Sequence, residues 1–247
     1  MAADLPGISR TIETDSGWEI SIAPFYGWVA GLNGDVATFG AAPIAVDITP
    51  IDLIENIDTV ISSLDFAIIG AAEIRKGDFG VFADIYYLDL STDLATPGPL
   101  FSGVEVGTEL LIFTALGSYR ALETETAHLD ALAGLRVWSV DIDLDFAAGI
   151  LPAQSHSDGD TWVDPVIGLK GRIALSEHAY VTGWGMIGGF GVSSDFMWDV
   201  FGAVGYEITD RISLVAGFRA TGVDYQSGGF LYDIIQYGPI IGGVVRF

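Results

Sequence analysis

Apolar and polar residues alternate with a period of two through most of the chain after Gly17. In residues 196–208, for example, Trp198 and Val200 fall on one face of an extended segment and Asp199 falls on the other. Successive side chains of a strand point to opposite faces, so this pattern predicts an all-β protein. About eleven segments show it, near 17–30, 35–48, 63–75, 79–90, 103–121, 127–147, 161–175, 178–190, 196–208, 211–224 and 230–247.

Composition restricts where such strands can lie. Half of the 247 residues are hydrophobic and the mean hydropathy is +0.46, yet the formal charge is −23 and the pI is near 4.1. No stretch approaches the roughly 20 apolar residues of a spanning helix, and the chain is too apolar for intrinsic disorder. With 10 basic against 33 acidic residues, nucleic-acid binding is not expected. The chain has no cysteine, which excludes thiolate metal sites and disulfides.

These features together predict a transmembrane antiparallel up-and-down β-barrel, with apolar faces toward lipid. The spacing of about 20 residues per strand and connection suits such barrels, and bacterial ones have even strand numbers. We therefore expect about twelve strands, with ten as the alternative. Residues 17–247 form the single barrel domain in this interpretation, and residues 1–16 form a flexible lead-in. Short polar turns alternate with longer loops, as expected for a periplasmic and an outer side.

Residues 50–61 depart from the strand pattern. Ile51, Ile54, Ile57 and Ile61 follow helical spacing, and Thr49 before Pro50 is a plausible helix start. We predict a short amphipathic helix that either caps the barrel or folds into its lumen.

The C-terminus places apolar residues on one face up to a terminal phenylalanine. This set, Phe247, Val245, Ile241 and Tyr237, resembles the assembly signal of bacterial outer-membrane barrels, although Gly243 interrupts the bulky pattern. Segments 162–168, 188–195, 204–206 and 217–219 also resemble porin-like outer-membrane proteins of Gram-negative bacteria. The resemblance implies a barrel in the cell outer membrane. It also implies contact with outer-membrane lipid, lipopolysaccharide and the barrel-assembly machinery.

The inward faces of the strands carry the residues of greatest functional interest. A charge facing lipid at the membrane midplane costs about 2–4 kcal/mol, so charged residues in strands are expected to point inward. The lumen-lining candidates are Asp65, Glu73, Arg75, Asp84, Asp130, Arg136, Asp164, Lys170, Arg172, Asp199 and Arg219. One interpretation is structural, with ion pairs that hold neighbouring strands in register. The other is a narrow polar pore.

Surplus acidic residues lie in loops and at strand ends. Asp141, Asp143 and Asp145 alternate with apolar residues in the opposite phase to residues 129–137, which suggests a strand leaving the membrane or a bulge near Trp138. Asp158 and Asp160, together with Asp164, resemble part of a calcium loop but lack its closing Glu. We therefore expect no specific metal site, although divalent cations are possible partners of the acidic loops.

The expected function is a porin-like narrow channel for small solutes or ions, or a closed structural barrel with a salt-bridged lumen. We expect no enzyme and no cofactor. One alternative is a lipid-modifying enzyme around His156, which stands between two serines, although neighbours in sequence cannot form a convergent triad. The other alternative is a surface interaction protein that acts through its acidic loops.

Overall fold

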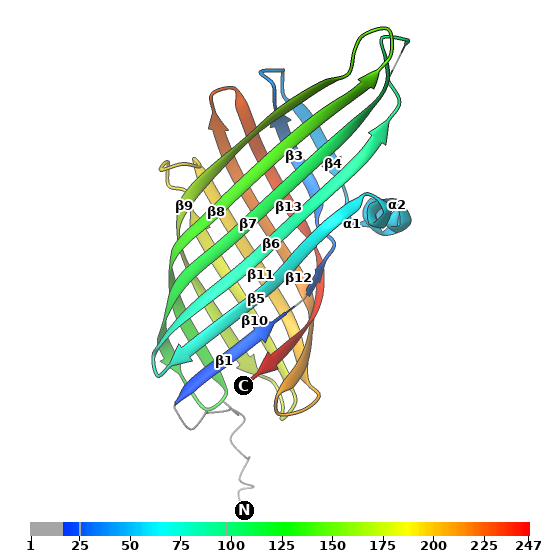
Figure 1. Ribbon diagram of the computed structural model, residues 1–247. Helices are drawn as coiled ribbons and strands as arrows, with labels where there is room; N and C mark the ends of the chain where they lie inside the picture. Colours follow the sequence, from blue (N-terminus) through cyan, green and yellow to red (C-terminus); the bar gives the residue numbers. More distant parts are fainter. Residues whose placement is uncertain (1–16, 25, 97) are drawn as a thin grey trace, which may run out of the picture.

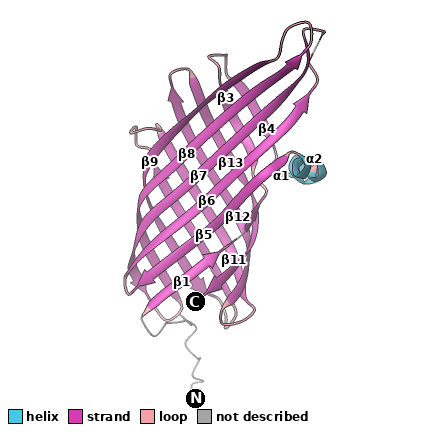
Figure 2. Ribbon diagram, in the orientation of Figure 1, coloured by secondary structure: helices cyan, strands magenta, loops and turns pink. Residues whose placement is uncertain are grey.

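A computed structural model describes residues 17–24, 26–96 and 98–247. The expected lead-in, residues 1–16, lies outside the described residues. Almost the whole described chain is strand, with two short helices near one side (Figures 1 and 2). The elements are β1 (Trp18–Ala23), β2 (Tyr26–Trp28), β3 (Gly31–Ala37), β4 (Ile44–Ile48), α1 (Pro50–Glu55), α2 (Ile57–Ser62), β5 (Leu64–Lys76), β6 (Phe79–Leu94), β7 (Phe101–Glu123), β8 (Ala127–Ala148), β9 (Gln154–Ala174), β10 (Ala179–Gly188), β11 (Phe196–Glu207), β12 (Ile212–Ser227) and β13 (Phe230–Arg246).

The strands form a closed antiparallel ring. From β5 to β13 each strand pairs with the next along the chain, and β1 closes the ring by pairing with both β5 and β13. The closed ring has 10 strands, the smaller of the two expected numbers. Three further strands are present but add none to the ring, because β2 and β3 continue the line of β1 along β13 and β4 pairs with β3.

The first strand of the ring is broken into three pieces that follow β13 in turn. β1, β2 and β3 pair with its residues 245–246, 240–242 and 231–237 respectively. At the second break the chain passes very close to β13, where a Cβ added to Gly238 would lie 1.8 Å from the carbonyl oxygen of Val29. A glycine at 238 is therefore required for this approach. β4 and the upper part of β5 are not paired with each other.

We call the end that holds Phe247 the C-terminal end and the opposite end the loop end. Short turns at 77–78, 124–126, 175–178 and 208–211 join strands at the C-terminal end, and the connections at the loop end range from two residues at 228–229 to seven at 189–195. The three longest strands, β7, β8 and β9, rise far beyond the others toward the loop end (Figure 1). Their pairing continues without a shift through Trp138, so the phase change in β8 marks a strand leaving the apolar band and there is no bulge.

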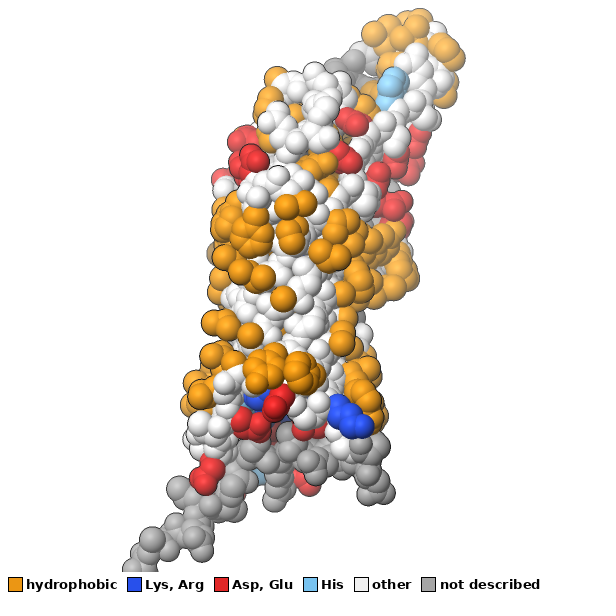
Figure 3. Space-filling view, turned by 90° about the vertical axis from the view of Figure 1, so that its left-hand side faces the viewer, with side chains coloured by type: hydrophobic (Ala, Val, Ile, Leu, Met, Phe, Trp, Pro, Cys, Tyr) orange, Lys and Arg blue, Asp and Glu red, His pale blue; other side chains and the backbone are white. Residues whose placement is uncertain are grey.

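Side chains alternate between the interior and the outer surface, as predicted. Large apolar side chains are exposed on the outer face, including Val81, Leu135, Ile167, Val200 and Leu214. On the face shown in Figure 3, hydrophobic side chains form a band across the wall, with acidic groups above it and charged groups of both signs below it. Among the helices of the described residues, none is long and apolar enough to cross a membrane.

The helical prediction for residues 50–61 is confirmed, but both expected placements were wrong. α1 and α2 lie outside the barrel wall, neither over its end nor in its lumen (Figure 1). Thr49 and Asp52 form the reciprocal capping box that starts α1, and their hydrogen bonds hold the pKa of the Asp52 carboxyl below its usual value. Ile51 and Ile61 are 65% and 62% exposed, so the apolar face points away from the barrel.

Candidate functional site: the barrel interior

A row of polar side chains crosses four neighbouring strands at the middle of the lumen. Asp84, Thr114, Arg136 and Asp164 occupy directly paired positions on β6, β7, β8 and β9. All four are at most 1% exposed. Because paired residues of adjacent strands point to the same face, the alternation that buries one of them buries the whole row. The row therefore forms one side of a polar layer.

Two arginines that extend into the lumen from different strands meet the same carboxylate. Arg136 on β8 donates to Asp199 Oδ2 on β11 at 2.6 Å, and Arg219 on β12 donates to the same oxygen at 2.8 Å. Arg219 also donates to Asp84 Oδ1 at 2.7 Å, across the barrel. Buried charges are tolerated only when they are paired and hydrogen-bonded, and here every charge of the layer has a partner.

Uncharged side chains complete this central network. Tyr26 donates to Asp84 at 2.5 Å and Trp184 donates to Asp199 at 2.9 Å. The Arg219 guanidinium lies 5.1 Å from the ring centre of Trp28 and 5.3 Å from that of Trp184, within the range of cation–π attraction. Sequence reasoning missed these residues. Trp184 and Thr114 share the inward alternation of their strands, whereas Tyr26 and Trp28 lie on a three-residue strand that has no pattern to read.

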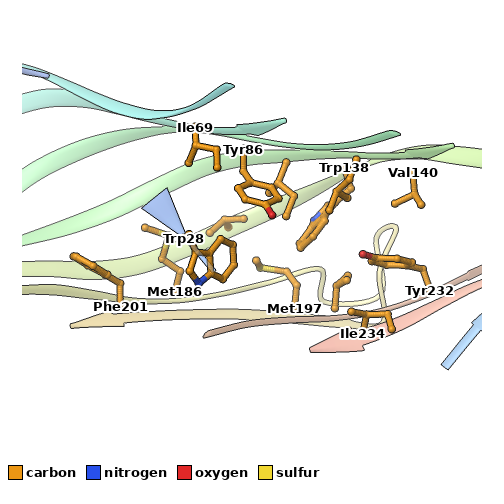
Figure 4. Packing of buried hydrophobic residues seen from close by; sticks show 14 of the residues in the cluster. Trp28, Ile69, Tyr86, Trp138, Val140, Met186, Met197, Phe201, Tyr232 and Ile234 are labelled. Atoms are coloured by element: carbon orange, nitrogen blue, oxygen red, sulfur yellow. The ribbon is translucent and has the colours of Figure 1, made fainter. Parts of the chain in front are cut away.

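Buried aromatic and aliphatic side chains pack along much of the lumen (Figure 4), and Trp138, Val140 and Tyr232 lie on the loop-end side of the central network. Trp162 stacks on Tyr225 at 3.9 Å and on Trp138 at 5.9 Å. The β10–β11 loop folds inward here, because the backbone amide and hydroxyl of Ser194 both donate to Asp164, at 2.9 and 2.7 Å. We call the stacked rings of Trp138, Trp162 and Tyr225 the aromatic plug, and they pack the upper lumen.

A second charged group lies below the central network, toward the C-terminal end. Arg75 pairs with Glu73 at 3.1 Å and with Asp130 at 2.8 Å, and Lys170 pairs with Glu73. Arg120 donates to Asp130 at 2.6 Å. Arg120 was not among the sequence candidates, although it continues the inward alternation of Thr114 and Ser118 along β7, and the irregularity of the strand begins only beyond it.

A third group, at the same end, joins Arg172 to Glu207. Glu207 also accepts from Arg246 at 3.1 Å. Ten of the eleven candidate residues thus lie in the interior network. Asp65 is the exception, because its side chain is exposed. It lies at a register shift between Leu64 and Phe66, where the side chains of β5 change from one face of the sheet to the other.

The barrel geometry can be compared with solved structures. The outer-membrane protease OmpT of Escherichia coli matches with a TM-score of 0.53 and 12% identity, over 93% of this chain and 96% of that one. The fold is that of an outer-membrane β-barrel. With its exposed apolar band, the chain is a multi-pass protein of the Gram-negative outer membrane. At 12% identity the likeness shows the fold alone and carries no activity.

Two further barrels match with lower scores. They are the attachment invasion locus protein Ail of Yersinia pestis (TM-score 0.32, 13% identity, 94% of this chain and 99% of that one) and the translocator domain of the autotransporter NalP of Neisseria meningitidis (0.43, 12%, 96% and 91%). No model of a known protein family matches the chain, and no curated protein matches its sequence.

The candidate assembly residues lie at the closure of the ring. Phe247 and Ile241 are 49% and 66% exposed on the outer face, and Val245 and Tyr237 are partly buried. The backbone amide of Phe247 donates to Ile20 of β1 at 2.9 Å. Recognition by the assembly machinery stays a prediction.

The expected acidic surplus lies on the outer wall above the apolar band. Asp93, Glu105 and Asp145 stand directly opposite one another on β6, β7 and β8, and Asp89, Glu109 and Asp141 form a second such row. We call these two rows the acidic wall. Asp158 and Asp160 do not join it, because they bind the backbone amide of Phe39 and the Tyr225 hydroxyl respectively. Within the described residues no cluster is arranged to hold a metal ion.

Because like charges directly opposite each other on neighbouring strands repel, Glu105→Gln should stabilise the barrel. It removes the central carboxylate of a row, so we expect a gain of about 0.5–1 kcal/mol in the free energy of unfolding at low salt. In 1 M NaCl the Debye length falls to about 3 Å and the gain should disappear. Urea unfolding in detergent measures both. Glu125→Gln, in a turn at the C-terminal end, is the control with the same charge change, and an equal gain there would contradict the row as the cause.

His156, the histidine of the lipid-enzyme alternative, has no catalytic partner among the described residues. His156 is exposed on β9 and its ring packs edge-on against Phe146. No hydrogen bond joins its imidazole to another described side chain. A nucleophile needs a base that is itself oriented by a third group, and nothing in the described surroundings of His156 supplies that arrangement.

Proposed function

We propose that the protein is a closed outer-membrane barrel whose lumen does not conduct. The observation that carries this is that the carboxylate of Asp199 on β11 binds Arg136 from across the lumen and also binds Arg219 of the neighbouring strand β12, which in turn reaches across to Asp84. Both arginines and the carboxylate are at most 1% exposed. An ion would have to break several charge-assisted hydrogen bonds to pass, and the aromatic plug closes the path above them.

Planar-bilayer recording of the refolded protein tests this proposal. We expect no steady current steps, because the central network spans the lumen without a gap for a hydrated ion. An open porin in the same bilayers is the positive control, and circular dichroism with heat-dependent gel migration shows that the silent protein is folded. Steady, ion-selective steps would overturn the closed barrel and support a narrow channel.

A second candidate function is surface interaction through the acidic wall. The observation in its favour is that six carboxylates are held in directly opposed rows, an arrangement that is unfavourable for stability and therefore calls for another reason to exist. We propose divalent cations and the phosphates of lipopolysaccharide as its partners. Calcium should raise the unfolding temperature of the wild type more than that of a Glu105→Gln, Glu109→Gln variant, and an equal rise would contradict the wall as the binding surface.

A further inference from the structure

The lower lumen contains a cavity of about 240 Å³. Its ceiling includes Tyr26 and Trp184, which both donate to carboxylates of the central network. Its walls reach the 124–127 turn region and the C-terminal residue Phe247. The cavity therefore opens at the C-terminal end and is closed above by the central network. In outer-membrane barrels the short turns face the periplasm, so we take this end as the periplasmic end.

Basic side chains are concentrated on this cavity in a chain that is otherwise strongly acidic. Five of the ten Lys and Arg residues line it. They are Arg75, Arg120, Lys170, Arg172 and Arg246. The acidic wall lies far from it on the outer surface at the loop end. Glu19, Glu73 and Glu123 also line the cavity, so an anion would be attracted only where the basic groups locally outnumber their carboxylate partners.

The two sides of the cavity differ in how completely their charges are paired. On one side Arg75, Arg120 and Lys170 have Glu73 and Asp130 as buried partners. On the other side Arg172 and Arg246 share a single carboxylate oxygen, Oε1 of Glu207. Two guanidinium groups on one carboxylate leave one positive charge in excess, and each guanidinium has more N–H donors than these contacts use.

Tyr180 holds this arginine pair in place. The Arg172 guanidinium lies 3.6 Å from the centre of the Tyr180 ring, and the Arg246 guanidinium lies 5.6 Å from it. The ring itself is fixed, because its hydroxyl lies 2.9 Å from Ser213 Oγ and because Gly205 leaves room for it. A pre-formed cationic pair of this kind loses little entropy when it binds an anion.

Apolar side chains line the cavity beside the arginine pair. They are contributed by facing strands and include Phe82, Trp184, Phe201, Val215 and Ile240. Trp184 and Phe201 are paired on β10 and β11, between the strands that carry the two arginines, so the cavity fits a ligand with an anionic group and a flat apolar body beside it. We propose that this cavity binds a small organic anion from the periplasm, with its charged group on Arg172 and Arg246 and its apolar body against Trp184 and Phe201.

This site is separate from the closed lumen, because a ligand below the central network binds whether or not ions pass above it. Isothermal titration of the refolded barrel in a non-ionic detergent tests it, with 2-naphthalenesulfonate as the probe. We expect saturable binding of one probe per barrel. The cationic analogue, naphthyl trimethylammonium, should not bind.

Arg172→Gln is the decisive variant, because it removes one cation and leaves Arg246 as the partner of Glu207. We expect the affinity for 2-naphthalenesulfonate to fall about tenfold or more, as for the loss of a charged hydrogen bond. Arg211→Gln is the matched control, since Arg211 is an exposed basic residue at the same end of the barrel, and its affinity should match that of the wild type. Equal binding by the Arg172→Gln variant, or binding of both probes alike, would overturn the proposal.

A second variant keeps the test valid if Arg172→Gln does not refold. Val244 lines the cavity, and Val244→Trp fills part of its volume while every charge stays in place. We expect this variant to lose probe binding although its arginine pair is intact. Unchanged binding would show that the probe binds the detergent or the outer surface, and would overturn the cavity as the site.

Discussion

Replacing Asp199 with alanine is expected to lower the free energy of unfolding by about 3–5 kcal/mol, the usual cost of breaking a buried ion pair by removing one partner. The variant leaves Arg136 without a carboxylate and Arg219 with only Asp84, all in a region that water does not reach. The cost comes from guanidinium groups that lose their partner and cannot be hydrated. Urea unfolding in detergent or lipid vesicles measures this loss.

Two further variants separate the network from a general effect of losing an acid. Asp195→Ala removes an exposed carboxylate from the loop before β11 and should change stability by no more than about 0.5 kcal/mol. A double variant, Arg136→Met with Asp199→Leu, removes both members of one pair. Its loss in the free energy of unfolding should be about 1–3 kcal/mol smaller than the sum of the losses of the two single variants, because the two residues are coupled. Strict additivity would show that the pair does not act as a unit.

The second large effect is expected at Gly238, where alanine should destabilise the barrel by about 3 kcal/mol, near the upper end of overpacking costs. The added Cβ would meet the carbonyl oxygen of Val29 at 1.8 Å and its carbonyl carbon at 2.9 Å. Both are backbone atoms, and the amide of Val29 is held by Pro239 at 3.1 Å, so the neighbour cannot rotate away as a flexible side chain would. The first strand would have to move off β13.

Gly202→Ala is the matched control for this prediction. Gly202 lies on β11, and a Cβ added there has no neighbour within 4 Å. The substitution should leave stability unchanged or raise it slightly, because alanine restricts the unfolded chain more than glycine does. If the two variants unfolded at the same urea concentration, the close approach of Val29 to β13 would not matter for stability.

The alternation of the sequence was enough to predict the barrel and the inward position of most charged residues. Arg136 and Arg219 could be placed inside because their neighbours along each strand are apolar and face lipid. Their partners could not be predicted, because alternation tells which face a residue occupies and not which strand lies across the lumen. Asp65 failed for a related reason, since one register shift reverses the face of every residue beyond it.

Helix placement and strand number needed information that a local pattern does not hold. Ile51 and Ile61 would be equally apolar against a lumen or against lipid, so their spacing predicted a helix but not its environment. The β3–β4 hairpin alternates like any other strand pair, and only the pairing shows that β3 continues the first strand of the ring along β13 while β4 adds no strand to the ring. Tyr26 and Trp28 contribute to the central network from a strand too short to show any period.

The closure of the ring has a consequence for local opening. Among the described residues, β1 meets β13 through only the pairs Ser21 with Arg246 and Ile22 with Val245, before β2 and β3 continue along β13, whereas β7 and β8 are paired from Phe101 to Glu123. Opening free energies follow the contacts that must be broken, so the seam between the two ends of the chain separates most easily. In hydrogen–deuterium exchange the amides of β1 should exchange long before those of β7 and β8, because the cylinder is closed at β1 by a very short run of paired residues.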